Sequence, residues 1–301
     1  MSIQELNNRF GIDNQLVFVE DPGGIAFADI DNESGTARLC LQGAHIVTFR
    51  PKSQVVPVVW VSQEARFAPG KSIRGGVPVC WPWFGPHAAE AGFPGHGFAR
   101  TVMWEVVGSA CRPDGTTRLS LALVANDVTR TQWPHETKVE LAIIVGNSLN
   151  LSLSTTNNGS SQLQLGEAFH TYFQIGDIED VHVAGLENTV YLDKVGEHCR
   201  RTQEGLIRFG GETDRVYVDT EASCSIVDTQ LKRRIVVRKT GSRSTVVWTP
   251  WTEKANKMGD FGLDGWRRMV CVETANALEN CVVLQPGETH SMTAEYSAEP
   301  F

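Results

Sequence analysis

The chain of 301 residues contains no apolar stretch of bilayer length, and its first ten residues lack the basic flank and apolar core of a signal peptide. It also lacks a basic excess, because its formal net charge at pH 7 is -8. Such a surface does not attract nucleic acid or anionic membrane, although a local arginine cluster can still bind an anion. We therefore expect a soluble, cytoplasmic protein that has neither nucleic acid nor membrane as a partner.

Cysteine is sparse, and its 7 copies are an odd number without a Cys-x-x-Cys pair. This argues against a secreted disulfide framework and a structural zinc site, and it favours reduced thiols. Cys224 and Cys271 lie in apolar contexts, so we interpret both as small core residues.

The 8 histidines form no His-x-x-x-His pair, and the motifs of serine hydrolases, P-loops and dinucleotide sites are missing. No metal site is predicted.

Long amphipathic helices are also missing, and the best short candidate is Ile3–Arg9. This excludes a parallel sheet with crossover helices. Short apolar runs bounded by Gly, Asn, Asp or Pro, several alternating at period two, instead predict antiparallel strands. The predicted strands are Leu16–Val19, Ile25–Ile30, His45–Phe49, Arg118–Leu123, Lys138–Ile144, Leu149–Ser154, Arg234–Arg238, Ser244–Trp248, Cys281–Leu284 and Ser291–Tyr296. The expected fold is all-β, a large antiparallel β-sandwich with very little helix.

No Pro/Ser-rich linker, charge block or fixed-period repeat divides the chain, so we expect a single domain over residues 1–301. The least regular segments, 78–96 and 248–268, are rich in Trp, Gly and Pro. Such loops either line a cleft or cover sheet edges. Their tryptophans pack in a core or stack on the apolar faces of a sugar ring.

The run Phe169–Phe173 reads as a buried strand, yet it contains the titratable side chain of His170. A histidine in such a place is either a satisfied core residue or a catalytic group. Glu273 ends another apolar run. Arg74 directly precedes a pair of glycines, and Arg100 follows a glycine-rich turn. Guanidinium groups match phosphate oxygens, so this set suggests proton transfer on a small phosphorylated substrate.

Each of these residues also has a structural interpretation. Either arginine can bridge loops through a protein carboxylate. Glu273 can form a buried ion pair with Arg267 or Arg268, and Asp214 can be a surface turn residue. Sequence reasoning alone leaves these alternatives open.

Seven motifs follow one another along the chain: Ile73–Pro78, Trp81–Gly85, His96–Arg100, Phe169–Phe173, Glu212–Asp214, Trp248–Trp251 and Val272–Glu273. In this order they resemble the aldose 1-epimerase superfamily, most closely its hexose-6-phosphate mutarotase branch, over about Gly43–Tyr296. The resemblance implies a galactose-mutarotase-like sandwich with an open cleft, catalytic His170 and Glu273, and substrate-binding Arg74, His96, Arg100 and Asp214. Gly95 stands where some relatives carry a side chain that can touch the sugar.

Anomer interconversion fits these residue types, because ring opening needs a base at O1–H and an acid at O5. From reference pKa values we expect Glu273 as the base and His170 as the acid, with no cofactor. The expected partner is a small-molecule hexose phosphate, and the chain is expected to be a monomer. Two alternatives stay open: a free-aldose mutarotase and a non-catalytic carbohydrate-phosphate-binding β-sandwich. Lys71 is a further candidate for the phosphate site.

Overall fold

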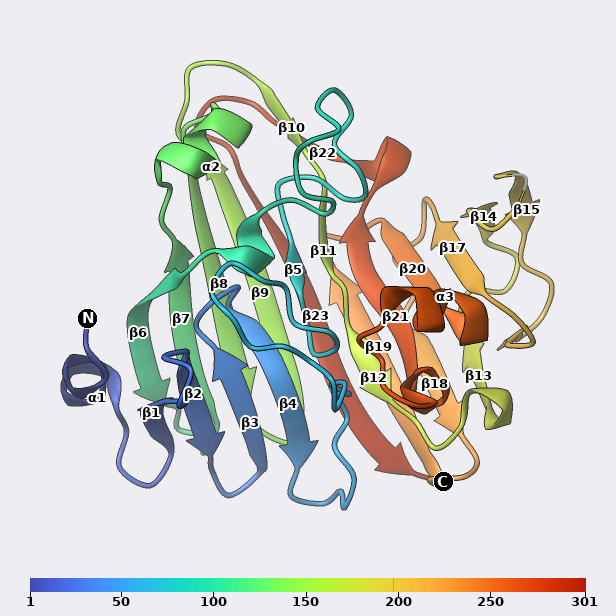
Figure 1. The fold of residues 1–301 in the computed structure, drawn as a ribbon, viewed down its shortest axis with the longest axis horizontal. Helices are drawn as coiled ribbons and strands as arrows, with labels where there is room; N and C mark the ends of the chain where they lie inside the picture. Colours follow the sequence, from blue (N-terminus) through green and yellow to red (C-terminus); the bar gives the residue numbers. More distant parts are fainter. Residues whose placement is uncertain (197) are drawn as a thin grey trace.

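The computed structural model describes residues 1–196 and 198–301, which form a layered antiparallel β-structure (Figure 1). One layer is a long sheet in the strand order β16-β13-β18-β19-β23-β9-β8-β7-β6. Its strands are β6 (Trp104–Cys111), β7 (Thr117–Leu123), β8 (Thr137–Val145), β9 (Ser148–Asn157), β13 (Val181–Ala184), β16 (Ile207–Arg208), β18 (Cys224–Asp228), β19 (Arg233–Thr240) and β23 (Thr289–Pro300). The predicted all-β fold class is confirmed.

Two further sheets lie against the long sheet and bury the core between the layers (Figure 1). The N-terminal sheet has the order β1-β2-β3-β4 and packs near β8. Its strands are β1 (Leu16–Glu20), β2 (Ala26–Asp31), β3 (Gly35–Cys40) and β4 (His45–Pro51). A short ladder joins β10 (Leu163–Leu165) to β22 (Val282–Leu284).

The third sheet, here called the cleft sheet, has the order β15-β14-β17-β20-β21-β11-β5, and β12 also pairs with β21. Its strands are β5 (Val79–Cys80), β11 (Glu167–Phe169), β12 (Tyr172–Gln174), β14 (Val190–Asp193), β15 (Arg200–Thr202), β17 (Thr213–Tyr217), β20 (Ser244–Thr249) and β21 (Met269–Asn276). Strand β21 contacts β23 of the long sheet. The cleft sheet therefore links distant parts of the sequence.

Burial explains why some strands were easier to predict than others. Strands β8 and β9 alternate between buried and half-buried residues, as expected when one face meets the core and the other meets solvent. Every residue of β20 and β21 is buried instead, so both faces of these strands are covered. A continuous apolar run is the signature of that second situation.

The predicted N-terminal helix is present as α1 (Ile3–Phe10), which begins with a capping box between Ser2 and Glu5. Two other helices were not predicted, α2 (Asp127–Gln132) and α3 (Trp251–Met258). Both are short and lie between strands, where too few turns exist to show a clear helical period. Short 3₁₀ segments cover Ala99–Thr101, Ile178–Asp180, Gly265–Arg268 and Leu278–Asn280. Within the described residues, no helix is both long and apolar enough to cross a membrane.

The run Phe169–Phe173 is not one strand. Strand β11 ends at Phe169 and β12 begins at Tyr172, so His170 and Thr171 lie in a break between two strands that both pair with β21. The prediction of a continuous strand was wrong because alternation and apolarity cannot show where ladder pairing stops.

Candidate active site

A cavity of about 250 Å³ opens beside the cleft sheet. Its walls bring together all of the candidate site residues predicted from the sequence, which are Arg74, His96, Arg100, His170, Asp214 and Glu273. These residues come from segments far apart in the chain. The cavity is therefore a product of the sheet topology, and its residues' functional roles remain predictions.

His170 is held in the break between β11 and β12 by its neighbours. Its backbone N–H donates to the carbonyl of Pro78 at 3.0 Å. The hydroxyl of Thr171 lies 2.6 Å from that of Tyr296 on β23, which ties the break to the long sheet. The imidazole stacks on Tyr172, with ring centroids 5.0 Å apart and planes at 10°. Packing thus fixes the orientation of the ring.

Glu273 lies in the middle of β21, opposite Val246 of β20, with a side chain that is 1% exposed. Nδ1 of His170 lies 3.3 Å from Oε1 of Glu273. Neither Arg267 nor Arg268 pairs with Glu273, because Arg267 bonds to Asp177 and Glu179, and Arg268 bonds to backbone and Gln230. The buried contact of Glu273 is therefore with His170 and not with either arginine.

Polar atoms of this pair lack partners within the protein. Among the described residues, no hydrogen bond reaches Oε2 of Glu273 or Nδ1 of His170. Buried polar groups are normally hydrogen-bonded, and exceptions gather where a ligand supplies the missing partner. The pair is therefore arranged to interact with something that enters the cavity.

Burial changes the acid–base properties of both groups. It raises the pKa of Glu273 well above its ordinary value, with help from Asp214 and against the opposing charges of Lys194 and Arg100. Burial also lowers the pKa of His170 well below its ordinary value, aided by His96 and nearby arginines. Both shifts favour the neutral forms. The one proton that the pair shares is therefore favoured on Glu273 rather than on His170, the reverse of the distribution expected from reference pKa values.

His96 and Arg100 form one edge of the cavity. The His96 ring lies against Phe84 and His170, with centroids 4.7 and 5.7 Å away. Burial, followed by the charges of Arg100 and Lys194, lowers the pKa of His96 to about 3. His96 is thus a neutral imidazole that can donate or accept a hydrogen bond. Arg100 donates through Nη2 to the carbonyl of Gly95 at 2.8 Å.

Arg74 is anchored on both sides. Its Nε donates to Oδ1 of Asp260 at 3.0 Å, and its Nη1 donates to the hydroxyl of Tyr172 at 2.9 Å. It also lies over the Phe261 ring, 5.0 Å from the centroid. The structural interpretation of Arg74, a bridge to a protein carboxylate, is therefore correct, and the same side chain also lines the cavity.

The glycines after Arg74 serve protein packing. Gly75 and Gly76 have φ values of 102° and 70°. A Cβ on Gly75 would lie 2.5 Å from the Cα of Val61, and one on Gly76 would lie 2.2 Å from Nε2 of His45. These positions require glycine because neighbouring protein atoms leave no space. The two glycines therefore allow close approach of one protein segment to another.

The sequence analysis missed two lysines that line the cavity, Lys194 and Lys254. Nζ of Lys194 lies 3.8 Å from Oδ1 of Asp214, and Nζ of Lys254 lies 2.6 Å from Oε1 of Glu212. Asp214 belongs to β17 and is not a surface turn residue. Lys71 is exposed and lies outside the cavity wall.

The tryptophans divide between core and cavity. Trp81 is 1% exposed and belongs to the core, whereas Trp248 lines the cavity and meets the His170 ring edge to face at 5.8 Å. Phe84 also lines the cavity. Trp248 and Phe84 therefore give the cavity apolar surface on which a sugar ring can pack.

Comparison with known proteins places this architecture and site in a family. Residues 28–297 match the family model described as aldose 1-epimerase. An Escherichia coli K12 protein named "Putative glucose-6-phosphate 1-epimerase" is 36% identical over 263 residues, which cover 87% of this chain and 86% of that protein. A protein of Cenchrus ciliaris with the same name is 34% identical over 273 residues, covering 88% and 82%.

Solved structures agree with the sequence relatives. A "putative mutarotase" from Salmonella typhimurium superimposes with a TM-score of 0.89 at 30% identity, covering 99% of each chain. A galactose mutarotase-like protein from Lactobacillus casei, with a TM-score of 0.70, 15% identity and coverage of 91% of this chain and 100% of that one, shares the fold. The chain belongs to the aldose 1-epimerase family. It is accordingly an epimerase, within the isomerases.

Proposed function

We propose that this protein is a hexose-6-phosphate mutarotase that interconverts the α and β anomers of glucose 6-phosphate or a related aldohexose 6-phosphate. One observation carries the proposal: an acid–base pair with buried polar atoms that lack hydrogen bonds from the described residues shares a cavity with the basic side chains of Arg74, Arg100, Lys194 and Lys254. The protein as a whole has a net charge of -8, so this local concentration of cations requires an explanation. An anionic group on the substrate provides one.

The reaction needs one proton on the His170–Glu273 pair. In the resting pair this proton lies on Glu273, and it passes to His170, whose Nδ1 lies 3.3 Å from Oε1 of Glu273. Glu273 then accepts the proton of O1–H while His170 donates to O5. The C1–O5 bond breaks and C1 becomes the aldehyde carbon. Rotation about C1–C2 turns the other face of the aldehyde toward the O5 hydroxyl. When O5 attacks C1 and the ring closes, Glu273 returns its proton to the carbonyl oxygen and His170 takes the proton from O5. Positioned acid–base catalysis of this kind contributes roughly 10²–10⁴-fold.

The surrounding charges favour this cycle. Lys194 and Arg100 oppose the burial of the Glu273 carboxylate, and they therefore stabilise the state in which Glu273 is ready to act as a base. We assign Asp214, which lines the cavity and is paired with Lys194, to accept hydrogen bonds from sugar hydroxyls. Trp248 and Phe84 provide apolar surface for the ring.

We assign the phosphate to Arg74 and Lys254, and Arg100 is a further cation that lines the cavity. Asp260 and Tyr172 hold the Arg74 guanidinium in place before a ligand binds, which limits the entropy lost on binding. Arg74 offers further N–H donors beyond those two bonds. The names carried by the Escherichia coli and Cenchrus ciliaris relatives support the same substrate class.

A free-aldose mutarotase is the second candidate, and a specific observation favours it. Arg74, Lys194 and Lys254 each contact a protein carboxylate, namely Asp260, Asp214 and Glu212. If these ion pairs persist during catalysis, the cavity presents less positive charge than its basic residues suggest, and a neutral sugar suffices.

Two-dimensional exchange NMR separates the candidates. Equilibrated glucose 6-phosphate and glucose are each measured with and without the protein. The proposal predicts protein-dependent cross-peaks between α and β anomers for the phosphate ester and little or no enhancement for glucose. Enhancement of glucose alone selects the free-aldose candidate. Binding of glucose 6-phosphate by calorimetry without anomer exchange selects the non-catalytic carbohydrate-phosphate-binding protein.

A further inference from the structure

A third side chain with a metal-ligating atom lies beside the acid–base pair. Cys271 and Glu273 are two residues apart on β21, so their side chains point to the same face of the strand. Cys271 is the register partner of Tyr172, on which the His170 ring stacks. Ligand atoms of His170, Cys271 and Glu273 all lie within 4.8 Å of one another.

Two of the three residues carry buried polar atoms that no hydrogen bond from the described residues satisfies, and the third is a free thiol. In the part of the chain that the structure describes, Nδ1 of His170 and Oε2 of Glu273 have no hydrogen-bond partner, and Glu273 is 1% exposed. Cys271 is a free thiol at 0% exposure. A buried polar atom without a partner is unfavourable unless something binds there.

We propose that His170, Cys271 and Glu273 form a binding site for one thiophilic divalent cation of the Zn²⁺ class, which inhibits the enzyme. Zinc bonds of about 2.0–2.3 Å place tetrahedral donors about 3.3–3.7 Å apart. The His170–Glu273 separation of 3.3 Å already fits that spacing. Cys271 needs to approach by only about 1 Å to complete the set. His170 and Glu273 also line the cavity, so a water or a sugar hydroxyl can supply the fourth ligand.

The donor types determine which cations bind. A thiolate with an imidazole favours Zn²⁺ or Co²⁺, whereas Mg²⁺ and Ca²⁺ prefer oxygen donors. On binding, the thiol proton and the proton shared by His170 and Glu273 pass to solvent, and the cation takes their places. The inhibition rests on the proposed function, because it follows from blocking the acid and the base. The cation is an inhibitor and not a cofactor, since the reaction needs both groups free.

Titration with Co²⁺ tests the site without depending on activity. Thiolate coordination to Co²⁺ gives a charge-transfer absorption in the near ultraviolet. We expect this band to saturate at one equivalent in the wild-type protein and to be lost in Cys271→Ser. Cys199→Ser is the matched control, because Cys199 is a more accessible thiol outside the site, and it should keep the band. Circular dichroism and thermal unfolding of Cys271→Ser and Cys271→Ala verify folding.

The outcomes are distinct. Absence of the band in the wild type, its persistence in folded Cys271→Ser, or its loss in Cys199→Ser overturns the proposal. In anomer-exchange measurements, Zn²⁺ should inhibit the wild type, and the inhibitory concentration should rise at least about tenfold in Cys271→Ser. If the wild type exchanges no anomers, the proposed function fails while the cobalt band still decides whether the cation site exists.

Discussion

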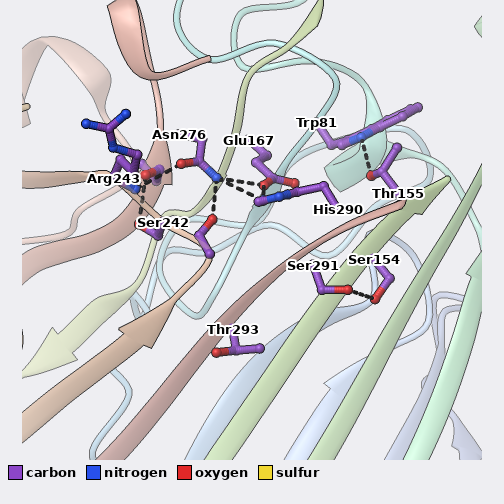
Figure 2. A network of polar contacts seen from close by, with 12 residues as sticks. Trp81, Ser154, Thr155, Glu167, Ser242, Arg243, Asn276, His290, Ser291 and Thr293 are labelled. Carbon is purple, nitrogen blue, oxygen red and sulfur yellow. Dashed lines mark hydrogen bonds and ion pairs between the residues drawn. The ribbon is translucent and has the colours of Figure 1, made fainter. Parts of the chain in front are cut away.

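Two buried carboxylate–imidazole pairs lie at the two ends of the same strand pairing, and they differ in what surrounds them. His170–Glu273 lies in the cavity, whereas His290–Glu167 lies between the cleft sheet and the long sheet (Figure 2). Nε2 of His290 is 3.0 Å from Oε1 of Glu167. Both glutamates are almost fully buried, at 1% and 0% exposure.

The protein provides hydrogen bonds to one pair only. Nδ2 of Asn276, the register partner of Glu167, donates to Oε1 of Glu167 at 2.9 Å and to the carbonyl of Gly241 at 2.8 Å (Figure 2). Among the described residues, no comparable donor reaches Glu273, and Oε2 of both carboxylates lacks a partner. The two pairs therefore differ in the hydrogen bonds that reach Oε1 of the glutamate and in the surroundings of the histidine.

The pKa values of the two histidines shift in opposite directions. Burial acts to lower the pKa of His290, but its hydrogen bond to Glu167 and the Glu167 charge outweigh burial and raise it above the ordinary value. Burial instead dominates at His170 and lowers its pKa. The same two residue types thus form a structural ion pair where another side chain donates to the carboxylate, and a candidate reactive pair where none of the described side chains does.

The largest expected effect separates the two histidines by activity. His170→Ala should lower the anomer-exchange rate by roughly 10²–10⁴-fold, because it removes the group that protonates O5. His290→Ala should keep most of the wild-type rate per folded molecule. Polarimetry of freshly dissolved α-anomer measures both rates. Equal losses in the two variants would show that both act through the fold.

The second effect separates the pairs by stability. Glu167→Gln should lower the free energy of unfolding by about 1–3 kcal/mol, because it leaves His290 without its charged partner between the sheets. Urea unfolding with circular dichroism detection measures the change. An unchanged midpoint would mean that the His290–Glu167 pair does not hold the layers together.

The third effect concerns Arg74, a cavity residue that is hydrogen-bonded to other side chains of the protein. Arg74→Ala should raise the KM for glucose 6-phosphate about tenfold or more, because it removes charge-assisted bonds to the phosphate, while the KM for glucose stays nearly constant. Asp260→Asn should cause a smaller rise, since it loosens Arg74 without removing it. Losses of similar size on both sugars would contradict the assignment of Arg74 to the phosphate.

The smallest effect is a pH dependence of stability. The pKa of His290 is higher in the folded protein than the unfolded value of about 6.5. Its contribution to the free energy of unfolding is therefore fully present below that pH. The contribution is lost as pH rises through the folded-state pKa. The stability difference between wild type and His290→Gln should therefore shrink as pH increases above about 6.5. A difference that grows with pH would contradict the raised pKa of His290.

Much of the fold could be predicted because strands that face solvent on one side carry their pattern locally. The alternation in β8 and β9 is of this kind. Short helices such as α3 were missed because they have too few turns to establish a period. The break at His170 was missed because strand ends depend on pairing with β21, which the local sequence does not contain.

The site was partly predictable for a related reason. His170 and Glu273 stood out as titratable groups in apolar runs, and the two arginines stood out beside glycines. Lys194 and Lys254 have no such local context, and only the folded sheet brings them to the cavity. The same holds for His290 and Glu167, which meet across two layers.

The most direct test compares Glu273→Gln with Glu167→Gln, the same change in the two pairs. Anomer exchange of glucose 6-phosphate is measured by exchange NMR alongside thermal unfolding of each variant. We expect Glu273→Gln to lose exchange while keeping its melting temperature, and Glu167→Gln to keep exchange while melting at a lower temperature. Retained exchange in folded Glu273→Gln would contradict the central claim that the unpartnered pair performs the chemistry.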